Sequence, residues 1–359
     1  MIQLSLPALA QAERAFVTRL RLDRDQLEAG DSLLFESDAT SATFAGPHGL
    51  LSIEGVLPSD LDGDVVLMQP DIQRIERLLR AGSPHNTLLI TERCDQLCVM
   101  CSQPPKKTHV DRFDLLEQAC LLAEPGIVIG ISGGEPTLYK EQLFGMIERV
   151  LEARDDLEFH ILSNAQHFGQ GDVERLRDPS FRRVTWGVPL YASDAVLHDE
   201  IVGKQGAFAR LEESLAWLML SGARVELRTV LVSPNLDALP ALARYVTRRL
   251  RFIDAWSIMQ LENIGFARNR WDNLYVDHSR SFAPVAEALT TATLHGVPAR
   301  LFNFPRCTVP EPFRHLAAAS ISDWKRKYVE ACGTCAERDA CTGFFEWHPE
   351  EAVEGVHPL

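Results

Sequence analysis

From His85 onward, the chain alternates short apolar runs with longer segments in which apolar residues recur at helical spacing. Six apolar runs of strand length fall at 86–90, 126–132, 157–163, 183–190, 224–232 and 255–261. Helical spacing between them is clearest at 114–123, 141–153, 207–220 and 238–250. Runs such as GIVIGI are apolar throughout, which is typical of parallel strands covered on both faces. Six β/α repeats predict an incomplete barrel, with a doubly wound open sheet as the alternative.

The segments on either side of this repeat differ from it in composition and in the spacing of apolar residues. At the N-terminal flank, Gly, Asp and Ser separate short apolar runs, which predicts strands and turns, whereas IQRIERLLRA (72–81) has the spacing of a short helix. The other flank is richer in Cys, Pro and Trp. We therefore expect an α/β protein with a small β-rich domain at 1–84, a partial (β/α)6 TIM-like barrel at 85–298 and a cysteine-rich extension at 299–359.

The net charge, the apolar stretches and the cysteine content indicate which partners and which cellular compartment to expect. The 359 residues carry a net charge of −14, which argues against a nucleic-acid partner. The start, MIQLSLPALAQAERAF, lacks a basic region before an apolar run, and we expect no membrane partner because the apolar stretches are too short to span a bilayer. We expect a cytoplasmic protein, where its eight cysteines stay reduced and clustered cysteines indicate metal binding or catalysis.

Cys94, Cys98 and Cys101 follow the first strand of the repeat at C-x3-C-x2-C spacing. Three thiolates from one loop can hold three corners of a [4Fe–4S] cluster, which normally takes four cysteines. One iron would stay open, and S-adenosylmethionine (SAM) can fill it with its amino and carboxylate groups. Zinc and ordinary buried thiols are the alternatives, although zinc sites usually show C-x2-C pairs and need a fourth ligand.

Several polar or glycine-rich positions lie at the ends of later strands, where barrel active sites gather. Two glycines before Glu135 permit close backbone approach, but a Gly-Gly-Glu-Pro turn is common. Ser163 and Asn164 suit ribose hydroxyls, or equally a turn or helix cap. Arg228 lies within a strand, where it would suit the SAM carboxylate if it points inward and form an ordinary ion pair if it points outward.

The spacing of these motifs resembles the radical SAM superfamily, in which a cluster reduces SAM to methionine and a 5′-deoxyadenosyl radical that abstracts hydrogen from a substrate. The resemblance implies that Cys94, Cys98 and Cys101 bind the cluster. The SAM contacts that it implies are Gly133, Gly134, Glu135, Pro136, Ser163, Asn164, Arg228, Gln260 and Glu262. Around Gln260 the superfamily often uses backbone against adenine, although the Glu262 side chain could face substrate instead. His198, Asp199, Gly203 and Gly206 also match a pattern of its peptide-modifying members, and we assign no general base.

A second set, Cys307, Cys332, Cys335 and Cys341, has C-x24-C-x2-C-x5-C spacing. Four thiolates can close a second [4Fe–4S] cluster or hold a structural zinc. This tail resembles the auxiliary-cluster extensions of radical SAM peptide maturases, in the short form called twitch rather than the longer SPASM form. Cys120 lies in an apolar helical segment and is interpreted as a packed residue.

TERCDQLCVMCSQPPKK, GFARNRWD and SISDWKRKYVEACGTCAERDACTGFF together are similar to the HxsC family of radical SAM maturases, which accompanies small His-Xaa-Ser proteins. This resemblance implies a peptide or small-protein substrate, an electron donor such as a flavodoxin or ferredoxin, and a partner maturase. An oxidoreductase that modifies peptides after translation is the leading hypothesis. A radical SAM enzyme acting on RNA or a small molecule, and a non-catalytic iron–sulfur or zinc protein, are the alternatives.

Overall fold

The computed structural model describes residues 2–350 and 356–359. The chain forms two compact units, and the boundary between them crosses the chain more than once. The first unit comprises Met1–Thr91 and Val110–His160, and the second comprises Glu92–His109 and Ile161–Leu359.

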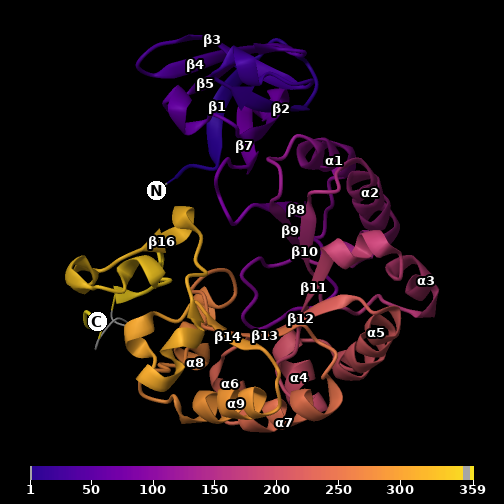
Figure 1. Ribbon diagram of the computed structural model, residues 1–359, viewed down its shortest axis with the longest axis vertical. Helices are drawn as coiled ribbons and strands as arrows, with labels where there is room; N and C mark the ends of the chain where they lie inside the picture. The colour runs from indigo at the N-terminus through magenta and orange to yellow at the C-terminus, as the bar shows by residue number, and fades with distance from the viewer. Residues whose placement is uncertain (1, 351–355) are drawn as a thin grey trace. The chain divides into compact units, whose positions relative to one another are not determined.

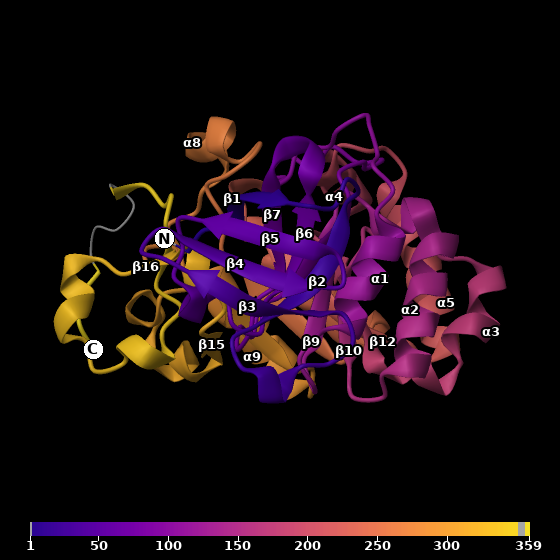
Figure 2. The same ribbon diagram turned by 90° about the horizontal axis from the view of Figure 1, so that it is seen from above.

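A closed β-barrel makes up most of the first unit (Figure 2). Its strands follow the order β1-β5-β4-β3-β2-β6-β7, and all neighbouring pairs are antiparallel except β2 with β3. The strands are β1 (Ser5–Ala10), β2 (Phe16–Arg21), β3 (Asp31–Ser37), β4 (Ser41–Gly46), β5 (Gly49–Glu54), β6 (Val65–Gln69) and β7 (Arg74–Leu79). Alternate side chains point inward and form a core that includes Leu20, Phe44 and Ile53.

The short helix predicted at 72–81 is wrong, because this segment is strand β7. Gln73 has a positive φ of 53°, which ends the preceding turn and prevents a continuous helix. Ile75 then pairs with Leu6 of β1 and Met68 of β6, and its side chain is fully buried. Pairing on both sides closes the barrel, so tertiary contacts override the helical spacing of the apolar residues.

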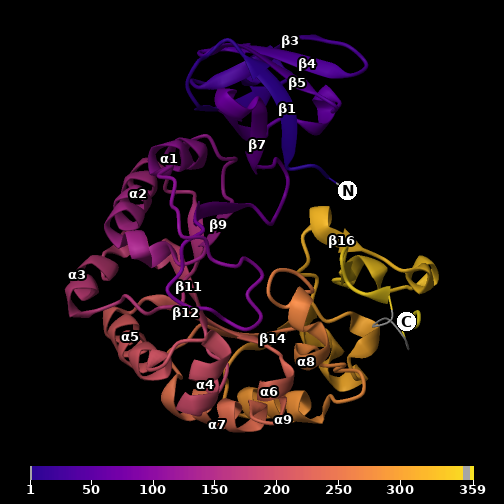
Figure 3. The same ribbon diagram turned by 180° about the vertical axis from the view of Figure 1, so that it is seen from behind.

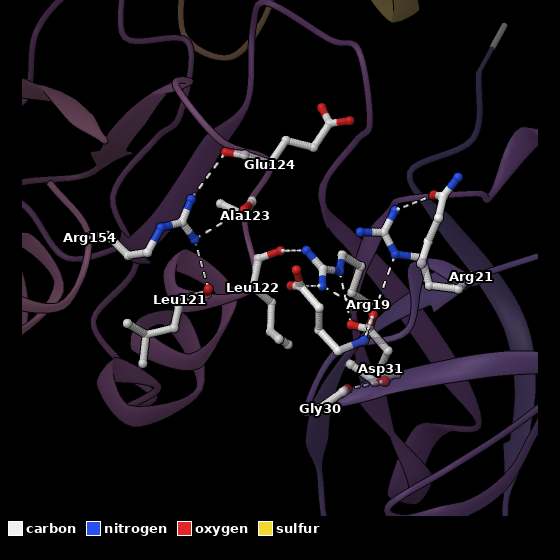
Figure 4. A network of polar contacts seen from close by, with 12 residues as sticks. Arg19, Arg21, Gly30, Asp31, Leu121, Leu122, Ala123, Glu124 and Arg154 are labelled. Carbon is white, nitrogen blue, oxygen red and sulfur yellow. Dashed lines mark hydrogen bonds and ion pairs between the residues drawn. The ribbon is translucent and has the colours of Figure 1, made fainter. Parts of the chain in front are cut away.

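Two strands and two helices complete the first unit: β8 (Thr87–Thr91), β9 (Val128–Gly133), α1 (Phe113–Leu121) and α2 (Lys140–Ala153). Buried arginine contacts fix the chain after α1 (Figure 4). Arg19 of the barrel pairs with Asp31 at 2.9 Å and donates to the Leu122 carbonyl at 3.3 Å. Arg154, after α2, donates to the carbonyls of Leu121 and Ala123. These bonds satisfy carbonyls that the end of α1 leaves without helical partners.

The second unit continues the β/α repeat, with its helices following one another along the outside of the strands (Figures 1 and 3). Its strands are β11 (Val184–Pro189), β12 (Arg224–Val230), β13 (Ala255–Met259), β14 (Ala299–Phe302) and β15 (Ala317–Ala318), and β10 (Glu158–Leu162) crosses the unit boundary. The helices are α3 (Val173–Leu176), α4 (Ala195–Val202), α5 (Ala207–Ser221), α6 (Ser233–Leu236), α7 (Leu239–Arg249), α8 (Trp271–Leu274) and α9 (Ala283–Leu294).

The eight strands β8 to β15 form one sheet in which spatial order follows chain order. Registers are parallel between β8 and β9 and from β11 through β15. A doubly wound sheet would reverse its order partway, so the prediction of an incomplete α/β barrel is confirmed. All six predicted strands are present, and two short strands, β14 and β15, extend the sheet beyond them.

The tail after β15 has little regular structure. Its one sheet is the antiparallel pair of β16 (Arg326–Lys327) and β17 (Phe344–Phe345), and short 3-10 turns carry Cys307 and Cys332. Within the described parts of the chain, none of the helices combines the length and the apolar character needed to cross a membrane.

Candidate functional site

The three cysteines of the first set lie in an irregular loop, residues 92–109, that directly follows β8. All three side chains are partly exposed. Burial, together with the neighbouring Cys101 and Cys94 thiols, raises the pKa of Cys98 to about 12. The Cys94 and Cys101 thiols therefore both affect the charge of the Cys98 sulfur.

The end of α4 holds one side of this cysteine loop. Leu97 donates its amide to the Val202 carbonyl at 3.0 Å, and Val99 donates to the Ile201 carbonyl at 2.8 Å. Gly203 then turns the chain with a φ of 64°, and a Cβ there would lie 2.6 Å from the Leu97 carbonyl oxygen. Only glycine allows both this backbone conformation and this close approach.

A second glycine holds the other side of the loop. The Phe266 amide donates to the Cys101 carbonyl at 2.8 Å, and Gly265 has a φ of 60°. A Cβ on Gly265 would lie 2.3 Å from the same carbonyl oxygen. Arg270 donates to the Val99 carbonyl at 2.8 Å while its guanidinium stacks 4.9 Å from the Phe266 ring centre. The GFARNRWD stretch therefore positions the cysteine loop.

Asp95, between the first two cysteines, ties the loop to the ends of β10 and α4. Its carboxylate accepts from Asn164 at 2.8 Å and from the Lys204 ammonium at 2.5 Å, and lies 3.3 Å from His167. Burial alone would raise the pKa of Asp95, but the bonds to His167, Lys204 and Asn164 hold it well below its usual range. Asp95 is therefore a charged anchor of the loop, which the sequence analysis missed although it lies inside the motif.

Tyr191, just past β11, links the cysteines to the β12 arginine. Its side chain packs with Met100 in a buried cluster. Burial, with the nearby Cys98 thiol, raises the pKa of Tyr191 well above its ordinary value, and Arg228 opposes that rise. Arg228 pairs with Glu226 on the same face of β12 at 3.0 Å. The arginine thus combines an ion pair with a position near the cysteine loop.

Ser163 and Asn164 form a tight turn at the end of β10. The Ser163 hydroxyl accepts from the Ala165 amide, and the Asn164 side-chain oxygen Oδ1 accepts from the Gln166 amide, each at 3.0 Å. Asn164 also reaches to 3.9 Å from the Cys94 sulfur. Ala165 is fully buried with a φ of 56°, a left-handed conformation that favours glycine.

The Gly-Gly-Glu-Pro segment belongs to the first unit. The Gly134 amide donates to the Thr91 carbonyl at 2.8 Å, and a Cβ on Gly133 would lie 2.3 Å from that oxygen. The buried Glu135 carboxylate accepts from the amide and hydroxyl of Thr137, and so caps the 3-10 turn that begins at Pro136. Gly133 and Glu135 therefore have structural roles in closing the turn after β9.

Gln260 and Glu262, which follow β13 and were expected to contact SAM, lie in different surroundings. The buried Gln260 side chain donates to the Val276 carbonyl and to His278 Nδ1, both at 2.8 Å. Its backbone amide donates to the Phe302 carbonyl at 3.0 Å, and its carbonyl accepts from the Asn303 side chain at 3.4 Å. Glu262 lies 3.6 Å from Lys325 of the tail. Burial raises the pKa of Glu262, while Lys325 opposes that rise.

The four cysteines of the second set line one cavity in the tail, together with Tyr328, Glu337 and other residues. All four thiols are free. Burial raises the pKa of Cys307, and the Cys341 and Cys332 thiols add to this rise. In residues 2–350 and 356–359, no three His, Cys, Asp or Glu side chains gather around a single-ion site. In a [4Fe–4S] cluster, by contrast, each thiolate binds its own iron atom.

The remaining motif residues are packed rather than open. Cys120 is fully buried in α1, as predicted. His198 is buried in α4, where its Nδ1 accepts from the Tyr191 amide at 3.3 Å. Asp199 caps α5 by accepting from the amides of Gly206 and Phe208. The His-Asp…Gly…Gly pattern therefore builds the α4–α5 turn that supports the cysteine loop.

Comparison with known proteins decides the family of this region. Residues 88–246, which include the cysteine loop, match the family model described as the Radical SAM superfamily. Residues 88–246 are therefore similar to radical SAM domains. The PqqA peptide cyclase of Methylocella silvestris is 25% identical over 154 residues, or 41% of this chain and 40% of that protein. This chain therefore matches about two fifths of that relative's length.

Two solved structures are among those that match parts of this chain. The crystal structure of Streptococcus suis SuiB bound to S-adenosylmethionine has 17% sequence identity and a TM-score of 0.48, over 60% of this chain and 49% of that chain. A radical SAM methyltransferase from Sphaerobacter thermophilus has 15% identity and a TM-score of 0.44, over 74% of each chain.

Proposed function

We propose that this radical SAM enzyme modifies a peptide or small protein, using an open cluster at the first cysteine loop and a closed cluster in the tail. The observation that carries the proposal is the cysteine loop itself. Its three cysteines lie in the region that matches the superfamily, and backbone bonds to the end of α4 and to Phe266 hold the loop in shape.

Cys94, Cys98 and Cys101 would hold a [4Fe–4S] cluster with one open iron, where SAM binds. Such a cluster would supply the one electron that cleaves SAM to methionine and a 5′-deoxyadenosyl radical, which would then abstract hydrogen from the substrate. The protein's own groups would bind and orient SAM. The residues proposed for this are Gly133, Gly134, Glu135, Pro136, Ser163, Asn164, Arg228, Gln260 and Glu262. Arg228 would attract the SAM carboxylate, and the backbone of the β9, β10 and β13 ends would supply neutral hydrogen bonds.

The tail cysteines Cys307, Cys332, Cys335 and Cys341 would hold a second, fully ligated cluster, with zinc as the competing metal. Their common cavity and their mutual electrostatic influence support a shared metal group. We also propose three domains, at 1–84, 85–298 and 299–359. The last of them would hold the second metal group.

The similarity to a PqqA peptide cyclase supports a peptide substrate. The HxsC-like stretches around the cysteines favour a protein with His-Xaa-Ser repeats. A flavodoxin or ferredoxin would deliver the electron that SAM cleavage consumes, and a second maturase is a further partner that we propose.

Iron analysis tests the two metal groups. Anaerobic reconstitution should give about eight irons per chain, and the combined Cys94→Ala, Cys98→Ala and Cys101→Ala variant should keep about four and lose 5′-deoxyadenosine formation. Cys120→Ala is the matched control, because the Cys120 thiol is buried in α1. This substitution should leave the iron content and the formation of 5′-deoxyadenosine unchanged. About four irons with retained zinc would assign zinc to the tail, and no 5′-deoxyadenosine from the loaded, intact protein would refute the enzymatic proposal.

Mass spectrometry tests the substrate. The reduced, reconstituted protein is incubated with SAM and a His-Xaa-Ser peptide, with a scrambled peptide of the same composition as control. A mass change confined to the repeat peptide is expected. Unchanged mass with such peptides, while 5′-deoxyadenosine forms, would contradict the peptide substrate and favour RNA or a small molecule.

A further inference from the structure

Residues 356–359 lie against the cavity that the four tail cysteines line, and His357 and Leu359 form part of its wall. The Leu359 amide donates to the Cys335 sulfur at 3.4 Å, and the His357 amide donates to the Cys307 sulfur. The Leu359 carbonyl accepts from the Ala336 amide at 2.9 Å, which fixes the segment beside the C-x2-C turn. One short segment thus contacts two cysteines that are distant in sequence.

Cys341 receives comparable bonds from other parts of the tail. Its sulfur accepts from the Arg306 amide at 3.3 Å and from the Gly343 amide at 3.5 Å. Gly343 has a φ of 65°, and a Cβ there would lie 2.8 Å from the Lys327 carbonyl oxygen, so glycine suits this approach. Three of the four thiols therefore accept backbone N–H groups, and residues 356–359 supply the donors for two of them.

Such bonds become stronger when the sulfur carries charge. A thiolate bound to iron is a better acceptor than a neutral thiol, because charge-assisted hydrogen bonds are about twice as strong as neutral ones. Hydrogen bonds to the sulfurs and exposure to solvent are among the factors that set the reduction potential of an iron–sulfur cluster. Donors favour the reduced state, which carries one more negative charge, and so they raise the potential.

We infer that residues 356–359 form a cap over the second cluster and raise its reduction potential through the amides of His357 and Leu359. The inference rests on the proposed function, because it requires that the four tail cysteines bind a [4Fe–4S] cluster. One electron enters the cluster on reduction, and no covalent bond forms or breaks. The cap acts by stabilising the extra charge on the cysteine sulfurs.

Proline substitution isolates the amides from the side chains. The background is the full chain with Cys94, Cys98 and Cys101 all replaced by Ala, so that any remaining cluster signal comes from the tail. In this background, Leu359→Pro and His357→Pro each remove one N–H donor. Leu359→Ala and His357→Ala are the matched controls, because they shorten the side chain and keep the donor.

Redox titration with dithionite, followed by electron paramagnetic resonance, gives the midpoint potential of each variant. Each Pro variant should have a lower midpoint than its Ala counterpart, with about four irons per chain in all of them. Equal midpoints in the Pro and Ala variants would overturn the cap while leaving the second cluster intact. Zinc in place of iron in the background protein would overturn the second cluster and the cap together.

A measurement on the unaltered cap guards against Pro variants that fail to fold. Electron–nuclear double resonance of the reduced background protein should show exchangeable protons coupled to the cluster, and these signals should disappear after exchange into D2O. Because the Arg306 and Gly343 amides also bond to Cys341, the signals of the cap are those that are lost when residues 356–359 are removed from the background protein. Leu359→Ala and His357→Ala should keep them. Their absence in the background protein would refute the cap independently of any substitution.

Discussion

Gly265→Ala is the sharpest test of how the cysteine loop is held. The φ of 60° places the residue in the left-handed region, where an alanine costs roughly 1–2 kcal/mol. The added Cβ would also lie 2.3 Å from the Cys101 carbonyl oxygen and 2.6 Å from that of Ser102. Both are backbone atoms, so relief requires the loop itself to move.

The control is Gly296→Ala. Gly296 has a similar φ of 69°, but no atom lies within 4 Å of its added Cβ. This variant therefore carries the conformational cost alone. Moving the loop in Gly265→Ala also weakens the Phe266 N–H bond to Cys101, worth about 1 kcal/mol. We expect a loss of about 2–4 kcal/mol for Gly265→Ala against about 1–2 kcal/mol for the control.

Equilibrium urea unfolding of the two variants in parallel measures this difference. Iron analysis after anaerobic reconstitution provides the functional reading, because displaced cysteines should bind the first cluster poorly. Gly265→Ala should fall from about eight irons per chain toward about four, while Gly296→Ala should keep about eight. Equal stability and equal iron in the two variants would refute the claim that Gly265 positions the loop.

Two further predictions concern buried charge. Arg19→Met leaves the fully buried Asp31 carboxylate with the more distant Arg21 at 3.4 Å and the Glu28 amide at 2.9 Å, so it should cost about 3–5 kcal/mol in urea unfolding. Arg177→Met, which breaks an exposed pair with Glu174, should cost less than about 1 kcal/mol, and similar losses in both would contradict the argument. Burial lowers the pKa of His198 to about 4, against a slight opposing effect of Asp199, so its neutral form stabilises the fold above the unfolded value of 6.5. That contribution, up to about 3 kcal/mol, should be lost as the pH falls from 6.5 to 4. The stability advantage of the wild-type protein over His198→Gln, measured by unfolding across this range, should therefore shrink toward low pH, and a constant difference would be inconsistent with a buried neutral histidine.

Much of the fold could be predicted because the repeat is local. Each β/α unit carries its own apolar run and helical segment, so six strands were found from spacing alone. Strands β14 and β15 were missed because they have four and two residues, too few to show a period. The segment of β7 was misassigned because its strand conformation depends on pairing with β1 and β6. Strand β1 is distant in sequence, and the two pairings occur together only in the closed barrel.

The same distinction applies to the candidate site: local sequence patterns show some of its residues, whereas others come from distant parts of the chain. The spacing of Cys94, Cys98 and Cys101 is visible because one short loop carries all three. The groups that hold this loop come from elsewhere, and nothing local singles out Lys204, Tyr191 or Arg270 as its partners. Asp95 could have been found, since a carboxylate between two metal-binding cysteines needs a nearby cation.

The two cysteine sets also differ in how their shape is maintained. The first loop has no regular structure of its own, yet backbone bonds from Val202, Ile201 and Phe266 and the Asp95 ion pairs fix it at both sides. The tail cysteines lie on short turns beside a sheet of two residues per strand, so fewer protein contacts define their positions. Metal binding contributes most to folding where the protein alone does not preform the site. The first cysteine loop is therefore held by protein contacts alone, whereas the order of the tail would depend more heavily on the proposed metal group and on residues 356–359.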